Sequence, residues 1–80
     1  MNNKENLQEW VLEALIDLNG IGRIVDVAKH IWEHHENDLK SSEDMFYTWQ
    51  YDMRWAATRL RESKKILPVE KSQKGEWRLT

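Results

Sequence analysis

The sequence has no cysteine, a single proline and three glycines among its 80 residues. Without cysteine, a disulfide framework and a zinc site built on thiolates are both excluded. No stretch approaches the ~18 consecutive apolar residues that a membrane-spanning helix needs. The polar first six residues also lack the apolar core of a signal peptide. We therefore expect a cytoplasmic chain that is held together by side-chain packing alone.

The short length limits the function classes as strongly as the missing residues do. Eighty residues suffice for one domain, and a chain of this size buries only roughly 60% of its unfolded surface. A catalytic cleft or a cofactor site has little room in such a chain. Five tryptophans supply the core instead, since each can bury about 200 Å². The prediction is a single domain over residues 1–80, with no enzymatic activity, no cofactor and no small-molecule substrate.

The formal net charge of -2 conceals an uneven distribution along the chain. Residues 1–44 hold four basic and ten acidic side chains, which gives -6. Residues 45–80 hold eight basic and four acidic side chains, which gives +4. This segregation favours an anionic partner for the second half, whereas ordinary solvated faces are the alternative.

Hydrophobic periodicity predicts three helices, over residues 7–18, over residues 24–36, and from about residue 43 or 47 to residue 63. Asn19-Gly20 ends the first helix, residues 21–23 form a short turn, and residues 37–42 break the pattern. Thr48 could cap a shorter third helix. The residues expected to face the core from the third helix are Phe46, Trp49, Met53, Ala56, Ala57 and Leu60.

The last fifteen residues change to a strand-like pattern. Residues 66–70 are a short apolar run at a sheet edge, residues 71–75 are a polar turn, and residues 76–80 alternate polar and apolar. A lone hairpin is marginal in water, so Trp77 and Leu79 should pack it on the helices. The fold class is therefore mainly α with a small β-hairpin, a three-helix winged helix-turn-helix.

Residues 47–61 resemble the third helix of the N-terminal winged-helix domain of Mrr-type restriction endonucleases. An Arg-Trp-Ala triplet precedes a leucine one turn later in that family, and a Trp-x-Leu-Thr strand follows the wing. The matching residues here are Arg54, Trp55, Ala56 and Leu60, and then Trp77, Arg78, Leu79 and Thr80.

The resemblance covers nearly the whole chain, with two departures. Lys64-Lys65 stands where the family usually has a glycine after the third helix, and the fused nuclease domain of the family is absent. The resemblance implies a module that binds DNA or senses its modification, without nuclease activity.

The outer face of the third helix carries the residues that favour DNA binding. Gln50, Arg54, Thr58 and Arg61 form one stripe at steps of three and four, with Tyr47 and Tyr51 beside it. On a helix in the major groove, arginine can pair with guanine and glutamine with adenine. Lysines of the helix end and the wing would contact phosphates; these are Lys64, Lys65, Lys71 and Lys74. The predicted partner is double-stranded DNA.

A protein-interaction module is the alternative prediction, because the isoelectric point of about 5.9 is low for a DNA-binding domain. If Trp10 and Trp32 are both partly exposed, a homodimer through the first two helices is expected. Such a dimer would also place two recognition helices on neighbouring half-sites. Trp55 falls at the boundary of the buried stripe, where the favoured interpretation is a residue that lies under the wing.

His30 to His34 match the H-x-x-E-H pattern of some zinc proteases. Two histidines one turn apart on a helix could share a zinc ion. The sequence places no third ligand beside them, and His35 points elsewhere. The favoured interpretation is therefore a polar histidine face, and no metal ion is predicted.

Overall fold

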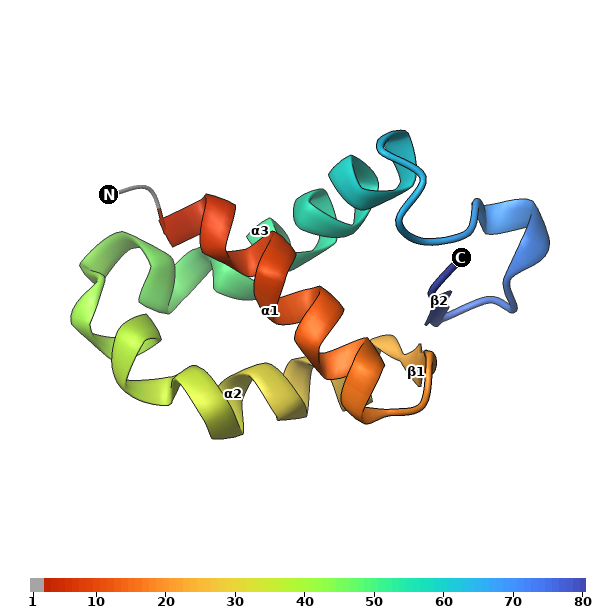
Figure 1. Cartoon of the computed structure of the whole chain (residues 1–80). Coiled ribbons are helices and arrows are strands. Elements are labelled where there is room, and N and C mark those ends of the chain that lie inside the picture. The colour runs from red at the N-terminus through yellow and green to blue at the C-terminus, as the bar shows by residue number, and fades with distance from the viewer. Residues whose placement is uncertain (1–2) are drawn as a thin grey trace.

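The computed structural model describes residues 3–80, with side chains from residue 6 onward. Three helices dominate it: α1 (Asn3–Asp17), α2 (Ile24–Ser41) and α3 (Glu43–Glu62). Between and after them come β1 (Ile21–Arg23), the short 3-10 helix η1 (Val69–Lys71) and β2 (Glu76–Arg78) (Figure 1). The fold is therefore mainly helical with a two-stranded antiparallel sheet. No helix in residues 3–80 is both long and apolar enough to cross a bilayer.

α1 lies across α3 and packs more extensively against it than against any other element (Figure 1). Its predicted apolar face is confirmed, because Leu7, Val11 and Leu15 are fully buried. Trp10, which the sequence left undecided, is also buried, with only 8% of its surface exposed.

α1 ends where the sequence predicts, in a left-handed cap. Asn19 has a φ of 66° and Gly20 a φ of 92°. The Gly20 N–H donates to the carbonyl of Leu15 and the Asn19 N–H to that of Ile16, which satisfies two carbonyls at the helix end.

The segment predicted as a short turn after α1 is strand β1, so that prediction is wrong. β1 pairs antiparallel with β2, and Gly22 lies opposite Trp77. The pairing joins two segments far apart in the sequence, which no local pattern over three residues could indicate.

α2 continues to Ser41, so the break predicted over residues 37–42 is wrong in position. The irregularity lies at His35, whose φ of -132° and ψ of 22° are non-helical. The His35 ring stacks on Trp10 at 4.1 Å between ring centroids, and its Nε2 donates to Glu13 at 3.1 Å. These contacts with α1 hold His35 at the kink, beyond which Leu39 is buried.

α3 takes the longer of its two predicted forms. Glu43 is its first residue and Thr48 lies inside it, so the shorter helix capped by Thr48 is wrong. Phe46 was predicted to face the core, but it is exposed, so that prediction is wrong. Met45 is buried in its place. Met45 lies one turn before the buried Trp49, so the two share a face.

The predicted C-terminal hairpin is only partly present. Ile66 forms a single bridge with Leu79, and the chain then turns into η1. Pro68 lacks an N–H for a strand ladder, and its carbonyl accepts from the N–H of Lys71. β2 pairs with β1 instead, and Trp77 is buried as predicted.

Candidate nucleic-acid interface

The outer side of α3 is exposed and carries no exposed carboxylate between residues 45 and 61. Gln50, Tyr51 and Arg54 are exposed there, with 65% of the Tyr51 surface accessible. Asp52 is the one acidic residue in that range. It is only 7% exposed, and its carboxylate accepts a hydrogen bond of 2.8 Å from Thr48 Oγ1. The accessible charges along this stretch are therefore all positive.

Gln50 and Arg54 line a groove of about 570 Å³ that also contains Lys74. One wall is the start of α2, and the other is the loop that precedes β2. The loop is anchored there because the Ile24 N–H, at the start of α2, donates to the carbonyl of Gly75 at 2.9 Å. Two α3 residues and one loop lysine predicted from the sequence thus share one groove.

A second, shallower depression of about 230 Å³ adjoins the groove through Arg54. Tyr51, Trp55 and Thr58 complete its lining. The Thr58 hydroxyl donates to the carbonyl of Arg54 at 3.2 Å, so its oxygen is the part left to accept from a ligand. Trp55 is 52% exposed, which shows that the interpretation of Trp55 as a residue covered by the wing is wrong.

Arg61 differs from the rest of the predicted stripe. It lines a separate depression of about 330 Å³ beside Lys74 and Trp77, beneath the loop 72–77. Its Nε is buried and has no hydrogen-bond partner within residues 3–80. The four-residue stripe expected from helical spacing is therefore divided, because the loop partly covers its C-terminal end.

The remaining predicted lysines are exposed around the end of α3 and η1. These are Lys64, Lys65 and Lys71. None of them is ion-paired to a carboxylate within the described residues. Lys64 has a φ of 64°, and the carbonyl of Lys65 accepts from the N–H of Thr80 at 3.2 Å. The backbone beneath these side chains is thus held, while their ammonium groups remain free for phosphates.

Arg23 is a groove residue that the sequence reasoning missed. It lines the groove with Gln50 and Arg54 because β1 pairs with β2, and β1 was predicted as a turn. Its Nε donates to Asp26 at 3.0 Å, and this hydrogen bond raises the pKa of Arg23 and lowers the pKa of Asp26. Since Asp26 neutralises much of its charge, Arg23 is a weaker candidate than Arg54.

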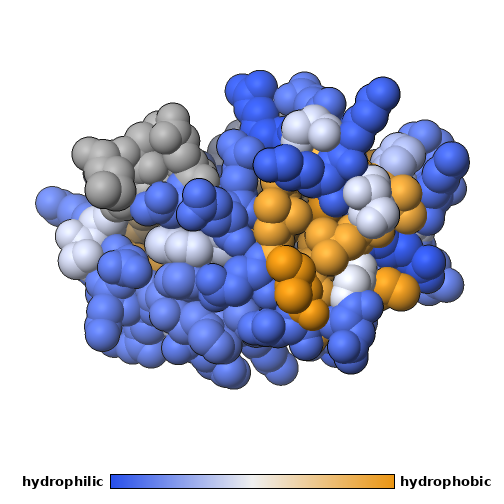
Figure 2. Space-filling view, viewed as in Figure 1, coloured by the Kyte–Doolittle hydropathy of each residue, from blue (hydrophilic) through white to orange (hydrophobic). Residues whose placement is uncertain are grey.

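The α1 side of the molecule is chemically different from the exposed side of α3. Figure 2 shows a hydrophobic patch over the C-terminal half of α1 and the neighbouring strands. Its most exposed aliphatic side chains on these elements are Ile16, at 64%, and Ile21. Trp10 is buried and Trp32 is half-buried against Trp49, so the condition set for a dimer through Trp10 and Trp32 is not met.

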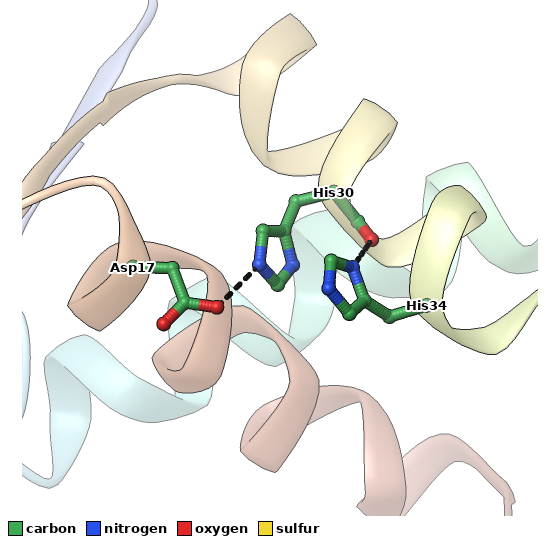
Figure 3. A group of neighbouring side chains, drawn as sticks. All are labelled: Asp17, His30 and His34. Carbon is green, nitrogen blue, oxygen red and sulfur yellow. Dashed lines mark hydrogen bonds and ion pairs between the residues drawn. The ribbon is translucent and has the colours of Figure 1, made fainter.

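Two histidine–carboxylate contacts join α1 to α2. One is the His35–Glu13 pair at the kink, and the other links His30 Nε2 to Asp17 Oδ2 at 2.7 Å (Figure 3). Asp17, His30 and His34 each offer one ligand atom, and these atoms lie within 4.8 Å of one another. Asp17, at the end of α1, is therefore a third potential ligand, which the sequence did not place beside the histidines.

No protein-family model matches the chain, and neither a search of curated proteins nor a search of solved structures finds a match.

Proposed function

We propose that this chain is a winged-helix protein that binds double-stranded DNA. In this proposal α3 enters the major groove, and the segment from residue 66 to residue 80 acts as the wing against the phosphate backbone. The proposal assigns no catalytic activity to the chain.

The arrangement of strands around the three helices supports a winged helix. β1 lies between α1 and α2 and pairs with β2 at the end of the chain. Ile66, just after α3, bridges Leu79, the residue after β2. Residues 76–79 are thus hydrogen-bonded to segments before α2 and after α3, so the wing is attached to the helical core.

One observation carries the DNA-binding proposal. Gln50, Arg54 and Lys74 share a groove, and the one carboxylate of α3 between residues 45 and 61 is buried. Glu76 also lines the groove, and its carboxylate accepts from Arg78. Gln50 and Arg54 can make bidentate contacts to adenine and guanine, respectively, and in this proposal Lys74 contacts a phosphate. Tyr51 and Thr58 extend the same surface through the adjoining depression.

The backbone at Lys64 also supports the resemblance to the Mrr-type winged-helix domain. That family usually has a glycine after the third helix, and Lys64 has the positive φ that favours glycine. The Lys65 N–H donates to the carbonyl of Leu60 and the Lys64 N–H to that of Arg61, as in a glycine-capped helix end. Lys64 therefore adopts the backbone conformation that a glycine would favour at this position.

The experiment is a titration of fluorescently labelled duplexes with the protein, followed by anisotropy at low and at physiological salt. The duplexes are random, methylated and otherwise modified. We expect binding that weakens steeply with salt. Arg54→Ala should weaken binding to a preferred duplex roughly 5- to 150-fold, the equivalent of ~1–3 kcal/mol.

Arg59→Ala is the matched control, because it removes the same charge from the same helix. Arg59 lies five residues from Arg54, on a different side of α3, and pairs with Glu62. Arg59→Ala should bind DNA nearly as the parent does. Equal losses of affinity in the two variants would mean that the groove contributes only non-specific electrostatic attraction. A parent protein that binds no duplex at low salt would contradict the proposal. Arg61 is a poorer test because its substitution also disturbs packing beneath the loop.

A protein-interaction module is the second candidate, favoured by the hydrophobic patch around Ile16 and Ile21 (Figure 2). Exposed apolar patches on small proteins often mark interfaces. Sedimentation equilibrium over a dilution series measures the mass directly. A parent dimer that dissociates in Ile16→Glu but persists in Val25→Glu would support this candidate, because Val25 is exposed in the groove beside α3.

A further inference from the structure

The group formed by Asp17, His30 and His34 joins the last residue of α1 to two residues one turn apart on α2 (Figure 3). It takes no part in the proposed DNA interface, which is built on α3 and the loop before β2. We propose that these three side chains bind one divalent first-row transition-metal ion, with zinc as the favoured metal.

The donor set is the first reason. Two imidazole nitrogens and one carboxylate oxygen are ligands that zinc prefers, whereas calcium and magnesium favour all-oxygen sites. Ligands about 2.0–2.1 Å from a tetrahedral ion lie roughly 3.3 Å apart. The three ligand atoms already lie within 4.8 Å of one another, so the group closes around an ion through side-chain movements alone.

The hydrogen bonding of His34 is the second, independent reason. Its Nδ1 lies 2.9 Å from the backbone carbonyl of His30. A carbonyl can only accept, so Nδ1 carries the proton and Nε2 of the neutral ring carries the free lone pair. Figure 3 shows that free nitrogen on the side of His34 that faces His30. A ring N–H donated to a backbone carbonyl is the usual arrangement behind a metal-ligating histidine.

His30 is also suited to the role of a ligand. Its Nε2 donates a hydrogen bond of 2.7 Å to Asp17 Oδ2, and a metal ion would bind Nε2 once the ring proton has moved to Nδ1. Its Nδ1 is buried and has no hydrogen-bond partner among residues 3–80, so no other contact holds the ring in one tautomer. The rings of His30 and His34 are stacked, with centroids 4.0 Å apart. Metal binding requires them to splay until their lone pairs converge.

The exposed positions of Asp17 and His34 give the ion access and allow the movement. Both residues are exposed, whereas His30 is half-buried and holds the inner position. With three protein ligands, the fourth position of a tetrahedral ion is left to water. The bound ion would join the C-terminal end of α1 to α2, and it should stabilise the packing of these two helices.

The test is calorimetric titration of the untagged, metal-stripped chain with Zn²⁺, with Mg²⁺ as the negative control and Co²⁺ as a spectroscopic probe. We expect one Zn²⁺ per chain, visible-region Co²⁺ bands of a tetrahedral site, and a higher melting temperature with zinc. Asp17→Asn and His34→Ala each remove an exposed ligand and leave the core intact. Either variant should lower zinc affinity at least ~100-fold. Removing a residue that only hydrogen-bonds to a metal ligand typically costs less, about 10- to 100-fold.

Glu33→Gln is the matched control, because it removes an exposed carboxylate next to His34 that is not part of the group. Its affinity for zinc should equal that of the parent. A parent that binds no zinc, or zinc binding that is unchanged in both Asp17→Asn and His34→Ala, would overturn the proposal. Circular dichroism of each variant without metal separates the loss of a ligand from the loss of the fold.

Discussion

Gly22 lies directly opposite Trp77 in the two-stranded sheet, and neighbouring side chains crowd the space that a Cβ would occupy. A Cβ at position 22 would lie 2.7 Å from Leu18 Cδ1 and 3.2 Å from Val27 Cγ2. Gly22→Ala should therefore lower the free energy of unfolding by ~1–3 kcal/mol, through overpacking at the end of α1. Urea denaturation monitored by tryptophan fluorescence measures this loss.

The same substitution made together with Leu18→Ala identifies the cause. Leu18→Ala removes the nearest atom, so Gly22→Ala should cost less in that background. The change in unfolding free energy of the double variant should differ from the sum of the two single changes by roughly 0.5 kcal/mol or more, as is expected for residues in direct contact. Additive effects of the two substitutions would instead point to a backbone cause at Gly22.

Trp77 is the buried aromatic residue of the sheet, with 3% of its surface exposed. Trp77→Ala should cost ~3–5 kcal/mol, because a large cavity is left between the sheet and the helices. Trp55→Ala is the comparison, and it should cost about 1 kcal/mol or less because half of that ring is already in water. The measurement is equilibrium unfolding in denaturant, and equal losses in the two variants would contradict the assignment of the core.

Lys64 has a φ of 64° at the end of α3, a conformation that costs a side chain roughly 1–2 kcal/mol. Lys64→Gly removes that cost and adds entropy to the unfolded chain, so a net gain of about 0.5–1 kcal/mol is expected. Asn19→Gly, at the equivalent cap of α1, should change stability less because asparagine tolerates this conformation. Thermal melts of both variants test the difference, and a destabilised Lys64→Gly would contradict it.

The lysines at the end of α3 should act on DNA only through phosphates. Replacing both Lys64 and Lys65 with alanine should reduce the slope of log affinity against log salt by about 2, with base preference unchanged. Lys40→Ala is the control, since Lys40 pairs with Glu36 at the far end of α2. An unchanged slope in the double variant would remove these lysines from the interface.

The helices were the part of the fold that the sequence predicted best. The spacing of Leu7, Val11 and Leu15, and of Trp49, Met53 and Leu60, is a local property, and it places those residues on buried faces whatever they pack against. The ends of α1 and α3 were predictable for the same reason, because cap conformations depend on neighbouring residues. Helical spacing also predicted the exposure of Gln50 and Arg54.

The strand pairing, the kink and the fine placement of the site residues could not be predicted in this way. β1 forms because β2 is beside it, and His35 leaves the helical conformation where it meets Trp10 and Glu13 of α1. Helical spacing puts Arg61 on the same face of α3 as Arg54. The loop before β2 nevertheless partly covers Arg61.

The sequence by itself determined three amphipathic helices, the cysteine-free core and the positive charge of the second half, because each follows from composition or from the period of a helix. Only the tertiary structure decided that Lys74 joins Gln50 and Arg54 in one groove, and that Asp17 lies beside His30 and His34. Both groupings bring together residues from separate elements. Their proximity depends on how the helices and the sheet pack, and that packing has no local pattern in the chain.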